Sequence, residues 1–173
     1  MSVPARLTAD QASALLPQLV TLLQDVVAGG ASIGFLRPLP ADVALHFWHD
    51  VIGEVARGSR LLLVIREGDQ VVGSIQLGLC LKPNGLHRAE VQKLLVHTAA
   101  RRRGLGRVLM SAVEAEARAV GRSLLYLDTE PDQPAEVLYR KLGWTEAGAI
   151  PDYACTPDGR LHPTVLFYKK IAP

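Results

Sequence analysis

The sequence predicts an α/β protein (mixed α+β), in which a mixed, mostly antiparallel sheet of about seven strands is flanked by helices. Three observations support this fold class. Two amphipathic helices come before a series of short apolar runs that are rich in β-branched residues. Residues 87–127 then have the pattern of strand, glycine turn, helix and strand, which predicts two parallel strands joined by a crossover helix. The last two apolar runs, 144–150 and 164–171, are expected to form a hairpin.

Two helices are expected ahead of the main strands, at 11–28 and 41–57. In both segments apolar residues recur at intervals of three and four, which is the period of an amphipathic helix. Thr8 or Asp10 can cap the first helix, since a short oxygen-bearing side chain accepts a hydrogen bond from the first turn. Pro17 lies inside the pattern and is expected to end or bend the first turn of that helix.

The remaining elements follow from apolar runs and turn residues. A meander of antiparallel strands is expected at 60–66, 71–81 and 87–96, because turn sequences rich in Gly, Asp, Pro and Asn separate these runs. A short strand is expected at 3–7, a helix at 105–120, a strand at 124–127 and a short helix at 135–142. Together with the hairpin, these elements are expected to form one domain over residues 1–173.

Composition excludes several functional classes. With 49% hydrophobic and 21% charged residues, the chain has the composition of a folded globular protein. Its net charge of +2 is too small to indicate nucleic-acid binding. No apolar run approaches the roughly 20 residues that span a bilayer, and the N-terminus lacks the apolar core of a signal peptide. Cys80 and Cys155 form neither a disulfide framework nor a metal-ligand set, and His46 and His49 lack a third ligand. We therefore expect a cytoplasmic protein with no metal.

The segment between the strand at 87–96 and the helix at 105–120 carries the strongest functional signal. Free N–H groups and the dipole at a helix start favour phosphate, and Gly104 and Gly106 allow the backbone to approach it closely. Nearby guanidinium groups can donate charged hydrogen bonds: Arg101, Arg102, Arg103 and Arg107. A plain turn with a solvated basic face is the alternative, but three consecutive arginines directly after a buried strand favour phosphate binding.

Residues 101–106, Arg-Arg-Arg-Gly-Leu-Gly, match the R-x-x-G-x-G signature of the GCN5-related N-acetyltransferases (GNAT), and the chain resembles that family. Residues 135–144 are similar to a second pattern of the family, A-x-x-L-Y-x-K-x-G-F/W. The resemblance implies the GNAT acyl-CoA N-acyltransferase fold, with acetyl-CoA as acetyl donor and its pantetheine arm alongside residues 94–96. The residues it assigns to this donor are Leu94, Leu95, Val96, Arg101, Arg102, Arg103, Gly104, Leu105, Gly106 and Arg107.

The same resemblance places three side chains around the reacting centre, in a gap between two splayed strands. Acetyl transfer requires a neutral amine, so Glu90 or Asp128 can accept its proton; either carboxylate can instead bind a cationic amine. Tyr139 lies off the apolar face of its helix, and a phenol with a pKa of about 10 matches a departing thiolate. The structural alternatives are hydrogen-bonded carboxylates at strand ends and a tyrosine bonded to backbone. Either Gln92 or Lys93 is expected to line the pocket.

Residues 29–35, 80–96, 127–130 and 152–169 more specifically resemble the tabtoxin-resistance acetyltransferases within this family. This resemblance implies that the acceptor is a small polar amine, including a β-lactam or amino-acid-like toxin. The loops at 29–39 and 151–163 are then rims of the acceptor pocket, or else a simple linker and a solvent-exposed hairpin tip. The candidate acceptor-binding residues are Phe35, Tyr153, Asp158, Arg160 and His162.

The leading hypothesis is therefore an acetyl-CoA-dependent N-acetyltransferase that acts on a small amine and contributes to antibiotic or toxin resistance. Transfer is direct, with no metal and no covalent enzyme intermediate. Two alternatives stay open. A protein or peptide N-acetyltransferase would need an open peptide groove, and a non-catalytic acyl-CoA sensor would not need the Glu90, Asp128 and Tyr139 side chains. No nucleic-acid or membrane partner is expected, and a homodimer is left open.

Overall fold

The computed structural model describes residues 3–156 and 159–172. Its helices and strands, in chain order, are β1 (Ala5–Arg6), α1 (Ala9–Ala14), α2 (Leu16–Ala28), α3 (Ala41–Ala56), β2 (Arg60–Glu67), β3 (Gln70–Leu79), β4 (Arg88–Val96), α4 (Leu105–Ala119), β5 (Leu124–Thr129), α5 (Pro134–Lys141), β6 (Thr145–Cys155) and β7 (Leu161–Lys170). Within the described ranges, none of the helices has both the length and the apolar character that crossing a membrane requires.

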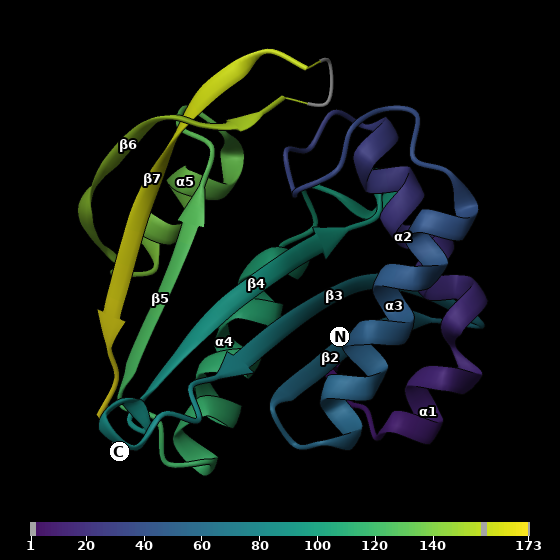
Figure 1. The fold of residues 1–173 in the computed structure, drawn as a ribbon. Helices are drawn as coiled ribbons and strands as arrows, with labels where there is room; N and C mark the ends of the chain where they lie inside the picture. Colours follow the sequence, from purple (N-terminus) through teal and green to yellow (C-terminus); the bar gives the residue numbers. More distant parts are fainter. Residues whose placement is uncertain (1–2, 157–158, 173) are drawn as a thin grey trace.

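The strands form one seven-stranded sheet in the order β1-β2-β3-β4-β5-β7-β6. Every neighbouring pair is antiparallel except β4 and β5, which are parallel and are joined through α4. The helices α1, α2 and α3 cover one face, while α4 and α5 cover the other (Figure 1). The predicted mixed, mostly antiparallel sheet with flanking helices is confirmed.

The N-terminal helical segment begins two residues earlier than predicted, at Ala9, and is divided into two helices. Thr8 forms a capping box with Gln11: the Gln11 N–H donates to the Thr8 hydroxyl at 3.2 Å, and the Thr8 N–H donates to Gln11 Oε1 at 2.9 Å. The expected single helix at 11–28 is two helices, because α1 ends at Ala14 and α2 begins at Leu16 with Pro17 in its first turn. Proline has no N–H to continue the first ladder, so the predicted break at Pro17 is confirmed.

Two apolar cores lie on opposite faces of the sheet and share its central strands. In β2, Leu61 and Leu63 pack into the core beneath α4, whereas Leu62 and Val64 pack against α1, α2 and α3. This is why β2 is apolar at nearly every position instead of alternating with polar residues. Trp48 of α3 is fully buried in the core between the sheet and the helices α1, α2 and α3, and it is among the largest side chains there.

The strand β4 moves its side chains from one core to the other. Its register with β3 shifts so that Lys93 and Leu94 together oppose a single residue of β3, which is a β-bulge. Lys93 has a φ of 49°, in the left-handed region. Val91 consequently faces the core beneath α4, while Leu95 faces the core of the N-terminal helices. Residues four apart would share a face in a regular strand, so the bulge decides which side chains reach the opening beside β4.

The predicted loop at 151–163 is wrong in its extent. The hairpin continues further, since β6 runs to Cys155 and β7 begins at Leu161. A register shift between Ile150 and Ala154 interrupts the pairing where Pro151 would have to donate a ladder hydrogen bond. Because β6 lies at the sheet edge, a proline and a bulge are tolerated there.

A buried polar network connects α4 to the hairpin. Glu114 is only 7% exposed. Its carboxylate accepts hydrogen bonds from Lys169 Nζ at 2.8 and 2.9 Å and from Trp144 Nε1 at 3.3 Å. Lys169 also donates to the carbonyl oxygen of Leu142 at 2.8 Å. Removing the carboxylate would leave a half-buried ammonium and a buried indole N–H without this acceptor.

We expect Glu114→Ala to lower the free energy of unfolding by about 3 kcal/mol, measured by urea denaturation with circular dichroism. The matched control on the same helix is Glu116→Ala, because Glu116 pairs with Arg6 at 3.3 Å on the surface. That change should cost less than about 1 kcal/mol. Equal losses for the two variants would contradict the role assigned to the buried network.

Candidate functional site

A cleft of about 630 Å³ lies where β4 and β5 separate. The two strands pair only from Arg88 and Leu124 to Glu90 and Tyr126, and they diverge beyond that point (Figure 1). The cleft is lined by the loop after α2, the second half of β4, the end of β5, the start of α5 and the β6–β7 hairpin. Backbone groups of β4 that face this gap have no partner on β5, so a ligand or water must satisfy them.

Two of the predicted acidic residues line this cleft. Glu90 is the last residue of β4 that pairs with β5, opposite Tyr126, and Asp128 lies two residues further along β5. The Thr164 hydroxyl donates to Asp128 Oδ2 at 2.9 Å, which orients the carboxylate. Burial, and then the Glu90 carboxylate, raise the pKa of Tyr126. The structure thus brings both carboxylates to one opening, as the sequence predicted, and adds Thr164, which sequence reasoning missed.

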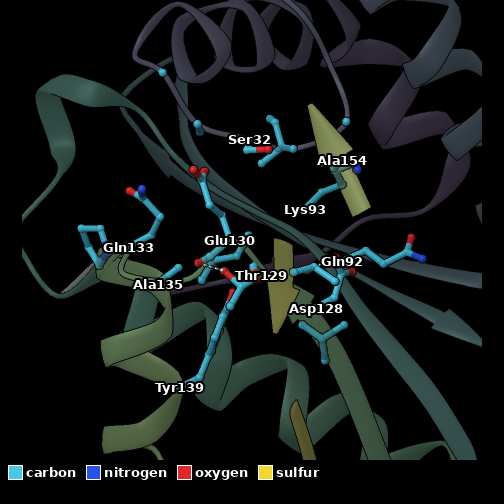
Figure 2. Close-up of a pocket in the computed structure, with 18 of the residues that line it drawn as sticks. Ser32, Gln92, Lys93, Asp128, Thr129, Glu130, Gln133, Ala135, Tyr139 and Ala154 are labelled. Carbon is cyan, nitrogen blue, oxygen red and sulfur yellow. Dashed lines mark hydrogen bonds between the residues drawn. The ribbon is translucent and has the colours of Figure 1, made fainter. Parts of the chain in front are cut away.

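Tyr139 reaches the same cleft from α5. Its ring packs near Trp144 and Phe167, with centroid distances of 6.1 and 6.2 Å, and the residue is 6% exposed. Figure 2 shows the side chain extending toward Thr129 at the end of β5. Burial, followed by the charge of Asp128, raises the pKa of the phenol. The hydroxyl therefore keeps its proton at neutral and moderately alkaline pH, and it is a weaker acid than an exposed phenol.

The start of α4 has backbone N–H groups without a side-chain cap. Gly104 occupies the N-cap with a φ of 81°, and it has no side chain to bond the first N–H groups of the helix. These groups remain available to a negatively charged ligand, and the helix dipole favours one. A Cβ on Gly106 would lie 3.2 Å from Leu138 Cδ2, so glycine lets α4 and α5 approach closely. The backbone of the predicted turn therefore fits a phosphate group.

The four arginines that were predicted to bind phosphate have different surroundings in the structure. Arg101 lines the cleft, and its Nε donates to the carbonyl oxygen of Val96 at 3.3 Å. Arg103 instead makes a two-pronged contact with Glu67 at 2.6 and 3.0 Å, which holds it against the β2–β3 turn. Arg102 and Arg107 are exposed. Of this group, Arg101 is the guanidinium that the fold aims at the cleft.

The apolar residues that were predicted to lie beside the acetyl donor differ in how far their side chains are exposed to the cleft. Leu94 lines the cleft, whereas the Leu95 and Leu105 side chains are buried and Val96 is half-buried. Any contact of Leu95 or Leu105 with a ligand would have to use the backbone. This agrees with the expectation that the strand presents N–H and C=O groups rather than side chains.

The bulge in β4 brings both Gln92 and Lys93 to the cleft, where sequence reasoning expected one of them. Lys93 Nζ lies 5.9 Å from the ring centroids of both Phe35 and Phe47. Burial lowers the pKa of Lys93, whereas Asp128 acts in the opposite direction. The period-two pattern of a regular strand could not show this arrangement, because the register shift is set by pairing with β3.

The acceptor loops meet across the mouth of the cleft. Ser32, from the loop after α2, and His162, from β7, are joined by a 3.0 Å hydrogen bond between Ser32 Oγ and His162 Nε2. His162 and Tyr153 both line the cleft, as predicted residues. Phe35 does not line it; its ring packs edge-on against Phe47, with 5.3 Å between centroids. The hairpin reaches across to the loop after α2 in Figure 1.

Two further predicted acceptor residues are not placed in the cleft. Arg160 is exposed and is not among the residues that line it. Asp158 lies outside the described residues. Within residues 3–156 and 159–172, no group of three or more His, Cys, Asp or Glu side chains is arranged to hold a metal ion.

The end of α2 is fastened to the segment that precedes the arginine–glycine turn. Asp25 accepts hydrogen bonds from the Thr98 N–H at 2.7 Å and the Thr98 hydroxyl at 2.6 Å. A Cβ on Gly29 would lie 2.9 Å from Thr98 Cγ2, so the two segments are packed without room for a side chain. The end of α2 and the segment that precedes α4 are therefore parts of one connected unit.

Comparison with protein families shows where this arrangement recurs. The model of the acetyltransferase (GNAT) family matches residues 32–144. An IAA acetyltransferase of Azospirillum brasilense is 35% identical over 109 residues, which cover 62% of this chain and 65% of that protein. The chain thus spans just under two thirds of the length of this curated relative.

Solved structures show the same fold over nearly the whole chain. The ribosomal-protein-alanine N-acetyltransferase from Brucella melitensis has a TM-score of 0.81 at 24% identity and covers 98% of this chain and 99% of its own. The yncA protein from Salmonella typhimurium, described with its cofactor acetyl-CoA, has a TM-score of 0.76 at 23% identity, with coverages of 98% and 95%. At these identities the likeness concerns the fold.

Proposed function

The chain belongs to the acetyltransferase (GNAT) family, and we propose that it transfers the acetyl group of acetyl-CoA to an amine of a small polar molecule. The observation that carries this proposal is the single cleft between β4 and β5. It brings together Arg101, which lies three residues before the Gly104 N-cap of α4, and the Glu90, Asp128 and Tyr139 side chains. A donor that has phosphates at one end and a reactive acyl group at the other fits such a cleft.

The donor side of the cleft would be formed by backbone groups and one guanidinium. The N–H groups at the start of α4 and the Arg101 side chain would hold the phosphates. The backbone N–H and C=O groups of the bulged part of β4, at Lys93 and Leu94, would hydrogen-bond the pantetheine arm as an added strand does, without using the side chains. When bound, acetyl-CoA supplies an acyl thioester. The description of the similar yncA structure with acetyl-CoA supports this assignment.

The acidic residues and Tyr139 serve the acceptor side. The attacking amine must lose a proton, and Asp128 or Glu90 accepts it, directly or through water. Thr164 keeps one oxygen of Asp128 occupied and so orients the other. As the acceptor nitrogen bonds to the acetyl carbon, the carbon–sulfur bond breaks and Tyr139 supplies a proton to the sulfur. The raised pKa of Tyr139 keeps the phenol protonated until the sulfur departs, and the negative charge that develops on the sulfur draws the proton from it.

The shape of the cleft favours a small acceptor over a peptide. The Ser32–His162 hydrogen bond connects two segments that line the cleft, and we propose that it limits the room for an extended chain. The proposal includes a β-lactam or amino-acid-like toxin as the acceptor, and with it a role in toxin or antibiotic resistance. It also includes a cytoplasmic reaction, because acetyl-CoA is available in the cytoplasm. The resemblance over the two acceptor loops and the β4 segment motivates the choice of toxin.

The proposal is tested by thiol release from acetyl-CoA in the presence of amino acids, β-lactam amines, aminoglycosides and peptides. We expect turnover with at least one class of small amine and little with peptides. Mass spectrometry of the product should show one added acetyl group on nitrogen. If the protein binds CoA tightly and no amine is acetylated, a CoA-binding sensor replaces the enzyme.

Tyr139→Phe should lower kcat by about 100-fold, because it removes the proton donor and keeps the ring that packs near Trp144 and Phe167. The KM for acetyl-CoA should change little. For the wild type, the raised pKa predicts no loss of kcat from phenol ionisation between pH 7 and about pH 10. The control is Tyr168→Phe, on β7, whose side chain is 37% exposed. Full activity of Tyr139→Phe would exclude Tyr139 as the donor.

Gly104→Ala should raise the Kd for CoA about tenfold, measured by calorimetry, because alanine is strained in the left-handed region that orients the start of α4. Gly121→Ala is the matched control. Gly121 has a φ of 74° just after the other end of α4, and neither glycine has a neighbour within 4 Å of an added Cβ. Both variants should lose similar stability. An equal loss of CoA affinity in both would indicate a general effect of destabilising α4.

A further inference from the structure

We propose that Lys93 binds a carboxylate of the acetyl acceptor, so that the acceptor is an amino acid or an amine of amino-acid type. The inference rests on the acetyltransferase function proposed above, and it adds the residue that selects the substrate. It is carried by an unpaired ammonium group in the cleft, by the engagement of the neighbouring cations, and by the acidic residues that share the cavity with it.

Lys93 is held in the cleft without a polar partner. In the part of the chain that the structure describes, its Nζ has neither a hydrogen-bond acceptor nor an ion-pair partner. Its recorded neighbours are the rings of Phe35 and Phe47, each 5.9 Å from Nζ at the centroid. An ammonium has three N–H donors, and ring faces alone leave them without acceptors. The half-buried ammonium is therefore ready for an anionic group from a ligand.

Of the other cations around the cleft, Arg60 is engaged by protein groups and Arg101 lies at the donor end. Arg60 donates to Gln76 Oε1 at 2.6 Å and also bonds Glu54 and Gln92. Arg101 turns toward the Val96 carbonyl oxygen, at the donor end. These contacts leave Lys93 as the cation with unused donors among the described residues that line the acceptor side. Arg60 and Gln92, which line the same cleft, are held by hydrogen bonds to each other and do not supply Lys93 with an acceptor.

The acids that share the cavity suit the other charge of an amino acid. Asp128 and Glu90 line the same cleft as Lys93 and raise its pKa by their charge, although burial has the larger, opposite effect. No ion pair forms between Lys93 and either carboxylate in the described structure. A cation and an anion that share a cavity without touching are complementary to a zwitterion. The amine would lie by Asp128, and the carboxylate would lie by Lys93.

Figure 2 shows this arrangement around the cavity. Lys93 lies beside Ala154, with Asp128 and Gln92 nearby, and Tyr139 enters from α5. Because Lys93 sits at the bulge with a φ of 49°, its side chain leaves the strand beside Gln92 instead of on the opposite face. A bound carboxylate would also favour the charged form of the amine, which burial disfavours. Ligand binding and protonation of Lys93 would thus support each other.

The experiment compares L-amino acids with their own carboxamides, which keep the amine and the carbon skeleton and lack the carboxylate. Initial rates of thiol release from acetyl-CoA give kcat/KM for each member of a pair. With the wild type, the free acid should be preferred by about 10- to 100-fold, which is the range of one charged hydrogen bond. The variants are Lys93→Gln, Lys93→Arg and, as a surface control, Lys82→Gln.

Lys93→Gln should lower kcat/KM for the free acid by about 10- to 100-fold, mainly through KM, and should leave the carboxamide within about threefold of the wild type. Lys93→Arg should recover part of the preference, because it keeps the charge. The Kd for CoA should be unchanged in both variants, and Lys82→Gln should behave as the wild type.

Several results would overturn the inference while leaving the acetyltransferase function in place. One is equal use of acids and carboxamides by the wild type, and another is an equal loss for both substrates in Lys93→Gln, which would indicate a structural or proton-transfer role. A weaker Kd for CoA in that variant would assign Lys93 to the donor. If no amine of either kind is acetylated, the proposed function fails and this inference fails with it.

Discussion

The separation of β4 from β5 is the constraint on which the rest of the structure depends. The strands pair through Glu90 and Tyr126 and then part, so the second half of β4 has backbone groups that face an opening. Elsewhere the sheet is continuous, and each face is covered by its own apolar core. Unpaired backbone inside a folded protein must find other partners, and a ligand that adds to β4 like a strand is the natural one. The gap therefore marks the part of the sheet where a ligand or water must complete the hydrogen bonding of β4.

The bulge in β4 adapts the strand to this gap. By inserting Lys93 opposite β3, it transfers Leu95 to the core of the N-terminal helices and leaves Gln92 and Lys93 side by side in the cleft. Lys93 takes an unfavourable left-handed φ of 49°, which the surrounding pairs maintain. The same local distortion thus serves packing on one side and recognition on the other.

Hydrogen bonds from α2 and from the loop that follows it connect the segment before α4 with the β6–β7 hairpin. Asp25 bonds Thr98, just before the arginine–glycine turn, while the loop that follows α2 carries Ser32 to His162 at the mouth of the cleft. The loop after α2, which lines the cleft, is consequently fastened to the segment that leads into α4. Order at the start of α4 and closure of the mouth are expected to depend on the same few contacts.

The sequence by itself determined the helices, most of the strands and the anion-binding turn, because these depend on residues close together in the chain. Periodicity located α3 and α4, and Gly104 and Gly106 marked the turn whose N–H groups are free. Only the tertiary structure decided what faces the cleft. The pairing register of β3 with β4 brought Lys93 to the cleft. Glu67 binds Arg103 outside the cleft, and the ring of Phe35 packs against Phe47 instead of lining the cleft. The Ser32–His162 contact joins residues 130 apart. Such pairings depend on how distant strands and loops are aligned in space, and no local pattern in the chain encodes that alignment.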